Sequence, residues 1–165
     1  MTQAIKTNST LCTEFQEEGV LFASWGHYLI NLWTTAQPTA KHLKKLGDAT
    51  KMLRSKNEQG VSLLVILEKA SLPTAEQRAL LSKYYSSHAD SFLCVGQVIE
   101  GRGLWAHTVR GILTTVNLLQ SAPYPAGVFK SVEGASRWAE RHNKVSPVDP
   151  AELTQKIQET RALGV

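Results

Sequence analysis

The run "VSLLVILE" at residues 61–68 is almost unbroken aliphatic sequence, and it is too short for a stable helix. A second run of the same kind, "SFLCVGQVI", follows at residues 91–99. Strands with apolar side chains on both faces are typical of parallel sheets that are covered on both sides, whereas half-exposed strands alternate apolar and polar residues. The two runs therefore predict two interior strands of a buried sheet.

Segments with helical spacing alternate with these strands. Thr39 is placed to cap a helix that runs to about Asn57, and Thr74 followed by Gln77 forms a capping-box pattern at the start of a second helix. Ser131 is placed to cap a helix in "VEGASRWAERHN". Two further helices are expected at residues 103–121 and 151–162.

A hairpin is predicted before the first helix. Two strand-like runs at residues 20–24 and 28–34 flank Gly26, which suits a tight turn. In the second run, side chains alternate between the two faces of the strand. One face carries Leu29, Asn31 and Trp33, and the other carries Tyr28, Ile30 and Leu32. A last short strand is expected at residues 126–129.

The resulting order of elements is ββαβαβαβα followed by a terminal helix. Repeated strand–helix–strand units imply right-handed crossovers and a mainly parallel sheet with one hairpin edge. We therefore expect an α/β fold with a single mixed, mostly parallel sheet of four to five strands and helices packed against it. The expected organisation is an N-terminal tail at 1–17, one domain at 18–145 and a C-terminal helical extension at 146–165.

Composition limits the class of protein. With 42% hydrophobic and 19% charged residues, the 165-residue chain is ordinary for one globular domain. No window approaches the 18 consecutive apolar residues of a membrane span. Cys12 and Cys94 are the two cysteines, and they do not form a CxxC pair. We therefore expect no disulfide framework, no secretory signal and a location in a reducing cytoplasm.

Positive charge is unevenly distributed. The net charge is +4, and residues 41–56 carry six cationic side chains against one acid, Asp48. Nucleic-acid binders add stacking aromatics or a larger basic excess, so nucleic acid is not an expected partner. The segment is read as a solvated helix face, or as a contact for an acidic protein.

The turn "IEGRGLWA" at residues 99–106 leads from a predicted strand into a predicted helix. Gly101, Gly103 and Ala106 satisfy the letters of the dinucleotide fingerprint G-x-G-x-x-[GA]. That motif belongs after the first strand of its unit and needs an acid about twenty residues on, yet residues 118–126 hold none. The favoured interpretation is a tight turn, with a weaker anion site at the helix start as the alternative.

Residues around this turn are the candidate ligand site. Trp25 and Trp105 are placed to wall a pocket, and Arg102 or Arg110 to hold an anionic group. The candidate ligand-binding residues are Trp25, Arg102, Gly103, Trp105, His107 and Arg110. The histidines and cysteines show no metal-ligand spacing, no nucleophile motif occurs and no cofactor is implied, so no catalytic residue is assigned.

The chain resembles the STAS family, the sulfate-transporter and anti-sigma-factor antagonist domains and related bacterial regulatory modules. The resemblance covers roughly residues 18–143 and depends on element order and on four local stretches. These are "VLFASWGHYLINLW", "VSLLVILE", "CVGQVIEGRGLWAHTVRGIL" and "VFKSVEGASRWAERH".

Members of the antagonist type carry a phosphorylatable serine or threonine in the loop after the strand that matches "VSLLVILE". In this chain the loop reads "EKASLPTAEQR", so the resemblance makes Ser71 the candidate phosphorylation site, with Thr74 nearby. The Asp before the serine and the Gly after it that mark the family motif are missing. The resemblance chiefly implies a module without catalytic residues.

Two functions follow as hypotheses. The first is a STAS-like regulatory or accessory module, not an enzyme, that binds a protein partner or a small anionic ligand. The alternative is a small enzyme, or a metabolite- or peptide-binding accessory protein, with a pocket near the 100–106 turn. Homodimerisation through the aromatic hairpin or the terminal helix is compatible with both.

Overall fold

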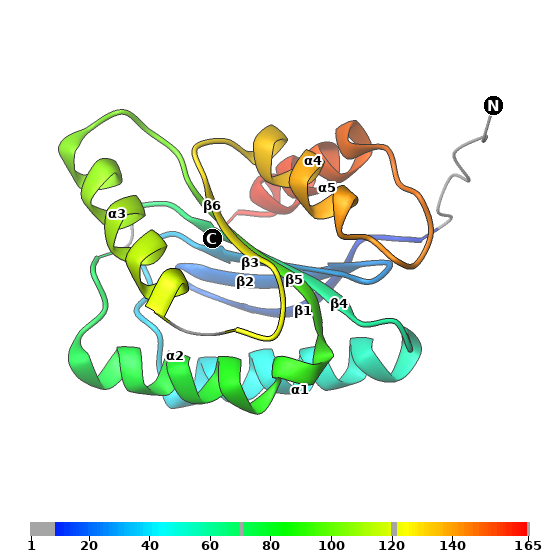
Figure 1. Ribbon diagram of the computed structural model, residues 1–165, viewed down its shortest axis with the longest axis horizontal. Coiled ribbons are helices and arrows are strands. Elements are labelled where there is room, and N and C mark those ends of the chain that lie inside the picture. The colour runs from blue at the N-terminus through cyan, green and yellow to red at the C-terminus, as the bar shows by residue number, and fades with distance from the viewer. Residues whose placement is uncertain (1–8, 70, 120–121, 165) are drawn as a thin grey trace.

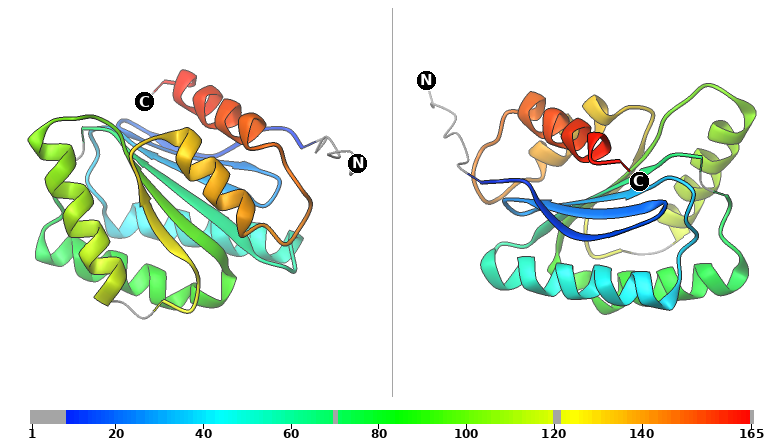
Figure 2. Two further views of the ribbon diagram at one scale, coloured as in Figure 1. Left: turned by 45° about the horizontal axis from the view of Figure 1, so that its top comes forward. Right: turned by 180° about the vertical axis from the view of Figure 1, so that it is seen from behind.

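The molecule is a three-layer α/β sandwich, seen in a computed structural model that describes residues 9–69, 71–119 and 122–164. A single sheet lies in the middle, with helices α1 (Ala40–Lys56) and α2 (Ala75–Ser87) on one face and α4 (Val132–Arg141) and α5 (Pro150–Ala162) on the other (Figure 1). Helix α3 (Leu104–Leu119) lies at one end of the sheet, where it contacts β5 and β6 (Figure 2). None of the helices described is long and apolar enough to cross a membrane.

The sheet has six strands in the order in which they occur along the chain. The first two pairings, β1 with β2 and β2 with β3, are antiparallel, and the pairings from β3 to β6 are all parallel. The strands are β1 (Cys12–Glu17), β2 (Val20–Trp25), β3 (Tyr28–Trp33), β4 (Val61–Leu67), β5 (Phe92–Ile99) and β6 (Ala126–Phe129). The predicted α/β class and mostly parallel sheet are confirmed, with one strand more than the four to five expected.

The additional strand is β1, inside the segment 1–17 that the sequence assigns to a tail. It pairs along the free edge of β2, and most of its residues are only partly covered. Phe15 supplies its apolar contact, with its ring 5.3 Å from that of Phe22. An edge strand with one large, partly buried side chain carries almost no periodic signal, so the sequence does not show it. Residues 1–8 of the segment lie outside the described residues.

The predicted helix starts are confirmed by their capping contacts. Thr39 accepts a hydrogen bond from the backbone of His42, and Ser131 accepts one from Gly134. Thr74 and Gln77 form the complete reciprocal capping box of α2. The last helix, α5, is capped by an aspartate instead of a serine or threonine. Asp149 is the cap, and Pro150 occupies the first turn.

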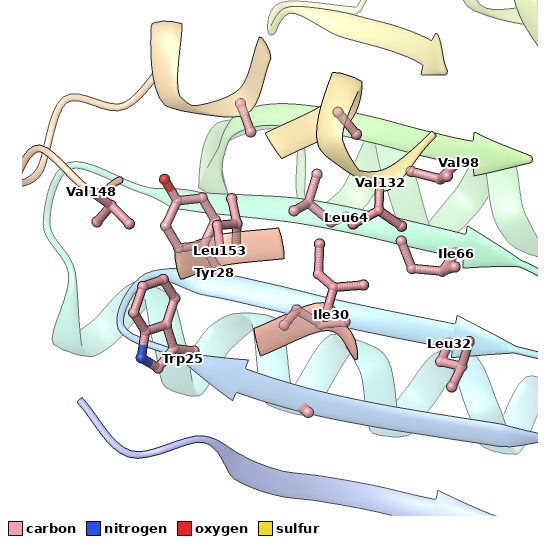
Figure 3. Packing of buried hydrophobic residues seen from close by; sticks show 14 of the residues in the cluster. Trp25, Tyr28, Ile30, Leu32, Leu64, Ile66, Val98, Val132, Val148 and Leu153 are labelled. Carbon is pink, nitrogen blue, oxygen red and sulfur yellow. The ribbon is translucent and has the colours of Figure 1, made fainter. Parts of the chain in front are cut away.

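One face of the sheet, covered by α4 and α5, forms a continuous apolar layer that we call the packed face (Figure 3). Alternate residues of β3, Tyr28 and Ile30 among them, point into this layer. Leu153 and Ile157 of α5 are fully buried there, so the predicted C-terminal extension covers part of the sheet. The opposite face, covered by α1, α2 and α3, is the cavity face described next.

Candidate functional site

Three residues form one row across the cavity face. Asn31 of β3 pairs in register with Val65 of β4, which in turn pairs with Gln97 of β5. Residues in register on neighbouring strands point to the same side, so the two carboxamides flank the valine. Each lies in the middle of an interior strand, where apolar residues are the rule.

This row is part of the floor of a cavity of about 410 Å³. Trp33, Leu67 and Val95 complete much of the floor, whereas α2 and α3 form the walls. The loops 36–38 and 71–73, which follow β3 and β4, close one end. The cavity thus extends from the middle of the strands to the carboxyl ends of β3 and β4, the end at which α/β sheets generally bind ligands.

The two carboxamides are buried with part of their hydrogen-bonding capacity unused. Asn31 is 2% exposed and Gln97 is 9% exposed, and no described residue donates a hydrogen bond to Asn31 Oδ1 or to Gln97 Oε1. Burial raises the pKa of Tyr85 to about 12, and the neighbouring Gln97 side chain opposes that rise. The phenol therefore stays protonated at neutral pH.

Charge is nearly absent from the lining. Arg78 of α2 is the one charged side chain among the described lining residues, and it is exposed. Its guanidinium already donates to the carbonyl oxygen of Pro73 at 2.9 Å. Leu72 is 45% exposed and Trp105 is 39% exposed although both line the cavity, so these two side chains lie between it and solvent.

A side chain of helix α3 holds the glycine turn that precedes the helix. Gly101 has a φ of +109°, a value that favours glycine. The guanidinium of Arg110, one of the candidate anion-binding groups, donates to the carbonyl oxygens of Ile99 at 2.8 Å and Gly101 at 3.1 Å. Arg110 thus holds the turn in place.

The structure brings only one of the predicted ligand-binding residues to the cavity, Trp105. Arg102, Gly103 and His107 are exposed and are not part of the lining. Arg110 is half-buried and does not line it either. Ser71, the candidate phosphorylation site, is exposed and does line the cavity, at the end closed by the loop after β4.

Trp25 lies on the packed face, away from the cavity. Its ring stacks on that of Tyr28 at 5.9 Å, and its indole nitrogen donates to the carbonyl oxygen of Ser9 at 2.9 Å. It is paired in the hairpin with Tyr28 and shares its face, whereas Trp33 belongs to the alternate set. The cavity therefore uses the second tryptophan of the hairpin instead of the first.

Cys94 is an inert thiol in this arrangement. It is fully buried on the packed face, and burial raises its pKa to about 11. A nucleophilic cysteine needs a lowered pKa and access to solvent. Among the residues that the structure describes, no group of three or more His, Cys, Asp or Glu side chains is arranged to hold a metal ion.

The residues that sequence reasoning missed are Asn31, Gln97 and Tyr85. Alternation assigns Asn31 to the same face as Trp33, which is correct, but it does not show that Gln97 lies in the same row. The available signal was the amide itself, a polar side chain inside an otherwise apolar interior strand.

No protein-family model matches the chain, and no curated protein matches it. Among solved structures it is similar to an uncharacterized protein from the DUF3478 family with a SpoIIAA-like fold, from Shewanella loihica PV-4. The two are 14% identical, the match covers 84% of this chain and 99% of that chain, and the TM-score is 0.40.

Proposed function

We propose that the chain is a STAS-like regulatory or accessory module that acts by binding a small molecule in the cavity between the sheet, α2 and α3. The observation that supports this most directly is the cavity of about 410 Å³ between these elements, which is lined mainly by apolar and aromatic side chains. Small-molecule sites in proteins are typically concave and mostly apolar, with a few polar groups.

The size and position of the cavity support the same proposal. Its 410 Å³ falls within the roughly 300–1,000 Å³ of small-molecule sites, which are mostly apolar with a few placed polar groups. The cavity also extends to the strand ends where α/β folds bind ligands. The 100–106 turn contributes through Trp105, whereas Arg102 and Arg110 lie outside the lining and give no support to an anionic ligand held by these arginines.

A protein partner is the second candidate, and it is favoured by one surface. Leu104 is 85% exposed, and it adjoins Trp105, which with Leu72 lies between the cavity and solvent. Exposed large apolar side chains that gather in one place are typical of protein contacts. A ligand that moved Leu72 or Trp105 would change this surface, which is how a binding module can report occupancy.

The proposal is tested with Nile red, an uncharged dye whose emission rises in apolar sites. We expect saturable binding to the wild-type protein and at least a tenfold loss of affinity in Ser82→Trp, because Ser82 lines the cavity and an indole would occupy it. Val65→Phe fills the same space from the sheet and should have the same effect. The matched control is Ser86→Trp, one turn along α2 on an exposed residue outside the lining.

Saturable binding that survives in Ser86→Trp and is lost in both cavity variants supports the proposal. No binding to the wild-type protein, or equal binding to all four proteins, would overturn it. Circular dichroism establishes that each variant is folded before its affinity is compared.

A further inference from the structure

One arginine ties the end of α5 to the ends of two parallel strands. Arg161 lies in the last turn of α5 and forms ion pairs with Glu68, at 2.6 Å from Nε to Oε1, and with Glu100, at 2.7 Å from Nη2 to Oε2. The two glutamates come directly after β4 and β5, one residue beyond Leu67 and Ile99, which pair in register. One side chain of the C-terminal helix thus joins two neighbouring strand ends.

Each glutamate is followed by a residue that turns the chain out of the sheet. Lys69 has a φ of +53° and is the one non-glycine residue with a positive φ among the described residues, and Gly101 has a φ of +109°. The loop that begins at Lys69 leads to Leu72, and the turn that begins at Gly101 leads to Trp105. Leu72 and Trp105 are the two side chains that lie between the cavity and solvent. Arg161 therefore joins the starting points of the two segments that cover the cavity.

We propose, resting on the function proposed above, that Arg161 is a positioning residue for ligand binding in the cavity. It holds Glu68 and Glu100 together from α5, and so fixes the two segments that carry Leu72 and Trp105. Carboxylates side by side on neighbouring strands repel each other, and the planar guanidinium pairs with both at once. Without the guanidinium, this repulsion favours a wider separation of the two strand ends.

Backbone hydrogen bonds connect these strand ends to the cavity. The amide of Glu68 donates to the carbonyl oxygen of Trp33 at 2.7 Å, and Trp33 is part of the cavity floor. In the other segment, the amide of His107 donates to the carbonyl oxygen of Gly103 at 3.1 Å and closes the first turn of α3. If Arg161 holds the two segments, both hydrogen bonds should open more often without it.

The expected size of the effect follows from the exposure of the three side chains. The Arg161 side chain is 18% exposed, and the two glutamate side chains are 35% and 41% exposed. Ion pairs that water partly screens contribute little each. We therefore expect Arg161→Gln to weaken Nile red binding by about two- to fivefold, mainly through faster dissociation. Exchange at the amides of Glu68 and His107 should quicken by a similar factor, whereas the amide of Leu64, in the middle of β4, should not change.

The coupling should also act in the reverse direction. A ligand that binds more tightly when Arg161 holds the segments must in turn stabilise the Arg161 contacts, because coupling between two sites is reciprocal. The amide of Leu163 donates to the carbonyl oxygen of Thr160 at 3.2 Å, beside Arg161 at the end of α5. Bound Nile red should therefore slow exchange at Leu163 in the wild-type protein and not in Arg161→Gln. An arginine that only stabilised the fold would not give this signal, since α5 covers the packed face.

Two controls separate this tie from a general loss of stability. Lys156→Gln is the matched control, since the ion pair of Lys156 with Glu159, at 2.9 Å, lies within α5. The second control is the double variant Glu68→Gln/Glu100→Gln, in which a further Arg161→Gln substitution should change neither affinity nor exchange. Nile red fluorescence measures affinity and dissociation rate, and amide exchange is measured with and without the dye.

Weaker binding and faster exchange in Arg161→Gln, both absent from Lys156→Gln, support the inference. Equal affinity of the wild-type protein and Arg161→Gln, or the same change in Lys156→Gln, would overturn it, and Nile red binding blocked by Ser82→Trp would still support the function proposed above. Absence of dye binding to the wild-type protein would overturn that function and the role of Arg161 in binding. Exchange without dye would then still show whether Arg161 holds the strand ends, so the two proposals fail separately.

Discussion

The two faces of the sheet are built from alternate residues of the same strands, yet they are covered to different extents. On the packed face, α4 buries four residues and α5 buries three, and side chains from both reach the sheet with no exposed surface. On the cavity face, α1 buries seven residues, whereas α2 buries one, Tyr84. The cavity lies under this thinly packed helix and α3.

Buried polar residues occur on both faces. In β3 the packed-face set is Tyr28, Ile30 and Leu32, whereas the cavity-face set includes Asn31. The tyrosine satisfies its hydroxyl by donating to Glu140 at 2.8 Å, but the asparagine oxygen has no described donor. The packed face is not free of such atoms, since Ser62 Oγ, in register with Tyr28, also has no hydrogen-bond partner among the described residues.

The largest expected difference between the faces is in the cost of removing one leucine side chain. Leu64 is fully buried on the packed face, whereas Leu67, on the same strand, is partly exposed and lines the cavity. We expect Leu64→Ala to lower the free energy of unfolding by about 2–5 kcal/mol, because it opens a void in a filled layer. Leu67→Ala should cost about 1 kcal/mol, since less apolar surface leaves water there.

Urea denaturation of the two variants measures this directly. Equal losses of stability would mean that the cavity face is packed as tightly as the other face. That result would remove the basis of the comparison.

The second prediction concerns pH and the packed-face side of the hairpin turn. His27 is 4% exposed beside the Tyr28 ring, and burial lowers its pKa to about 4, with nearby Glu140 opposing the shift. The folded protein therefore holds the neutral ring, while the unfolded chain binds a proton at the ordinary pKa of about 6.5. The free energy of unfolding therefore keeps its full value above pH 6.5. It falls by up to about 3 kcal/mol as the pH drops toward 4, and then levels off.

The measurement is the free energy of unfolding between pH 7 and 4 for wild type and His27→Gln. The variant lacks the titrating group, so its curve should be flatter by the amount that His27 contributes. Parallel curves for the two proteins would contradict this account of the turn.

The same contrast explains what the sequence could predict. Interior strands such as 61–68 were predictable because both of their faces are apolar, and capped helices because Thr39, Thr74 and Ser131 carry local signals. Strand β1 was not predictable, since it is held by pairing with β2 and none of its own residues is buried. Local pattern fails where tertiary contacts decide the structure.

The site was predicted less well for a physical reason. Trp105 was found because it adjoins the glycine turn, but the row of Asn31, Val65 and Gln97 exists only through the register of three strands. Register between parallel strands is set by their crossover helices and cannot be counted along the chain. Arg102 and His107 were proposed from their places at the glycine turn and along the helix that follows it, but both side chains are exposed and lie outside the lining.

The smallest expected effect compares the caps of one helix from each face. Thr74→Ala removes the capping box of α2, and Ser131→Ala removes the side-chain cap of α4, each worth about 1 kcal/mol to its helix. Because α2 buries so little, its first turn should open locally, and amide exchange at residues 75–78 should quicken about fivefold with little change in global stability. Helix α4 is part of the packed layer, so Ser131→Ala should lower the global free energy of unfolding by the full amount.

Hydrogen exchange and urea denaturation on both variants separate the two responses. If Thr74→Ala lowered global stability as much as Ser131→Ala, then α2 would unfold only with the whole domain, and the cover of the cavity would be as rigid as the layer opposite.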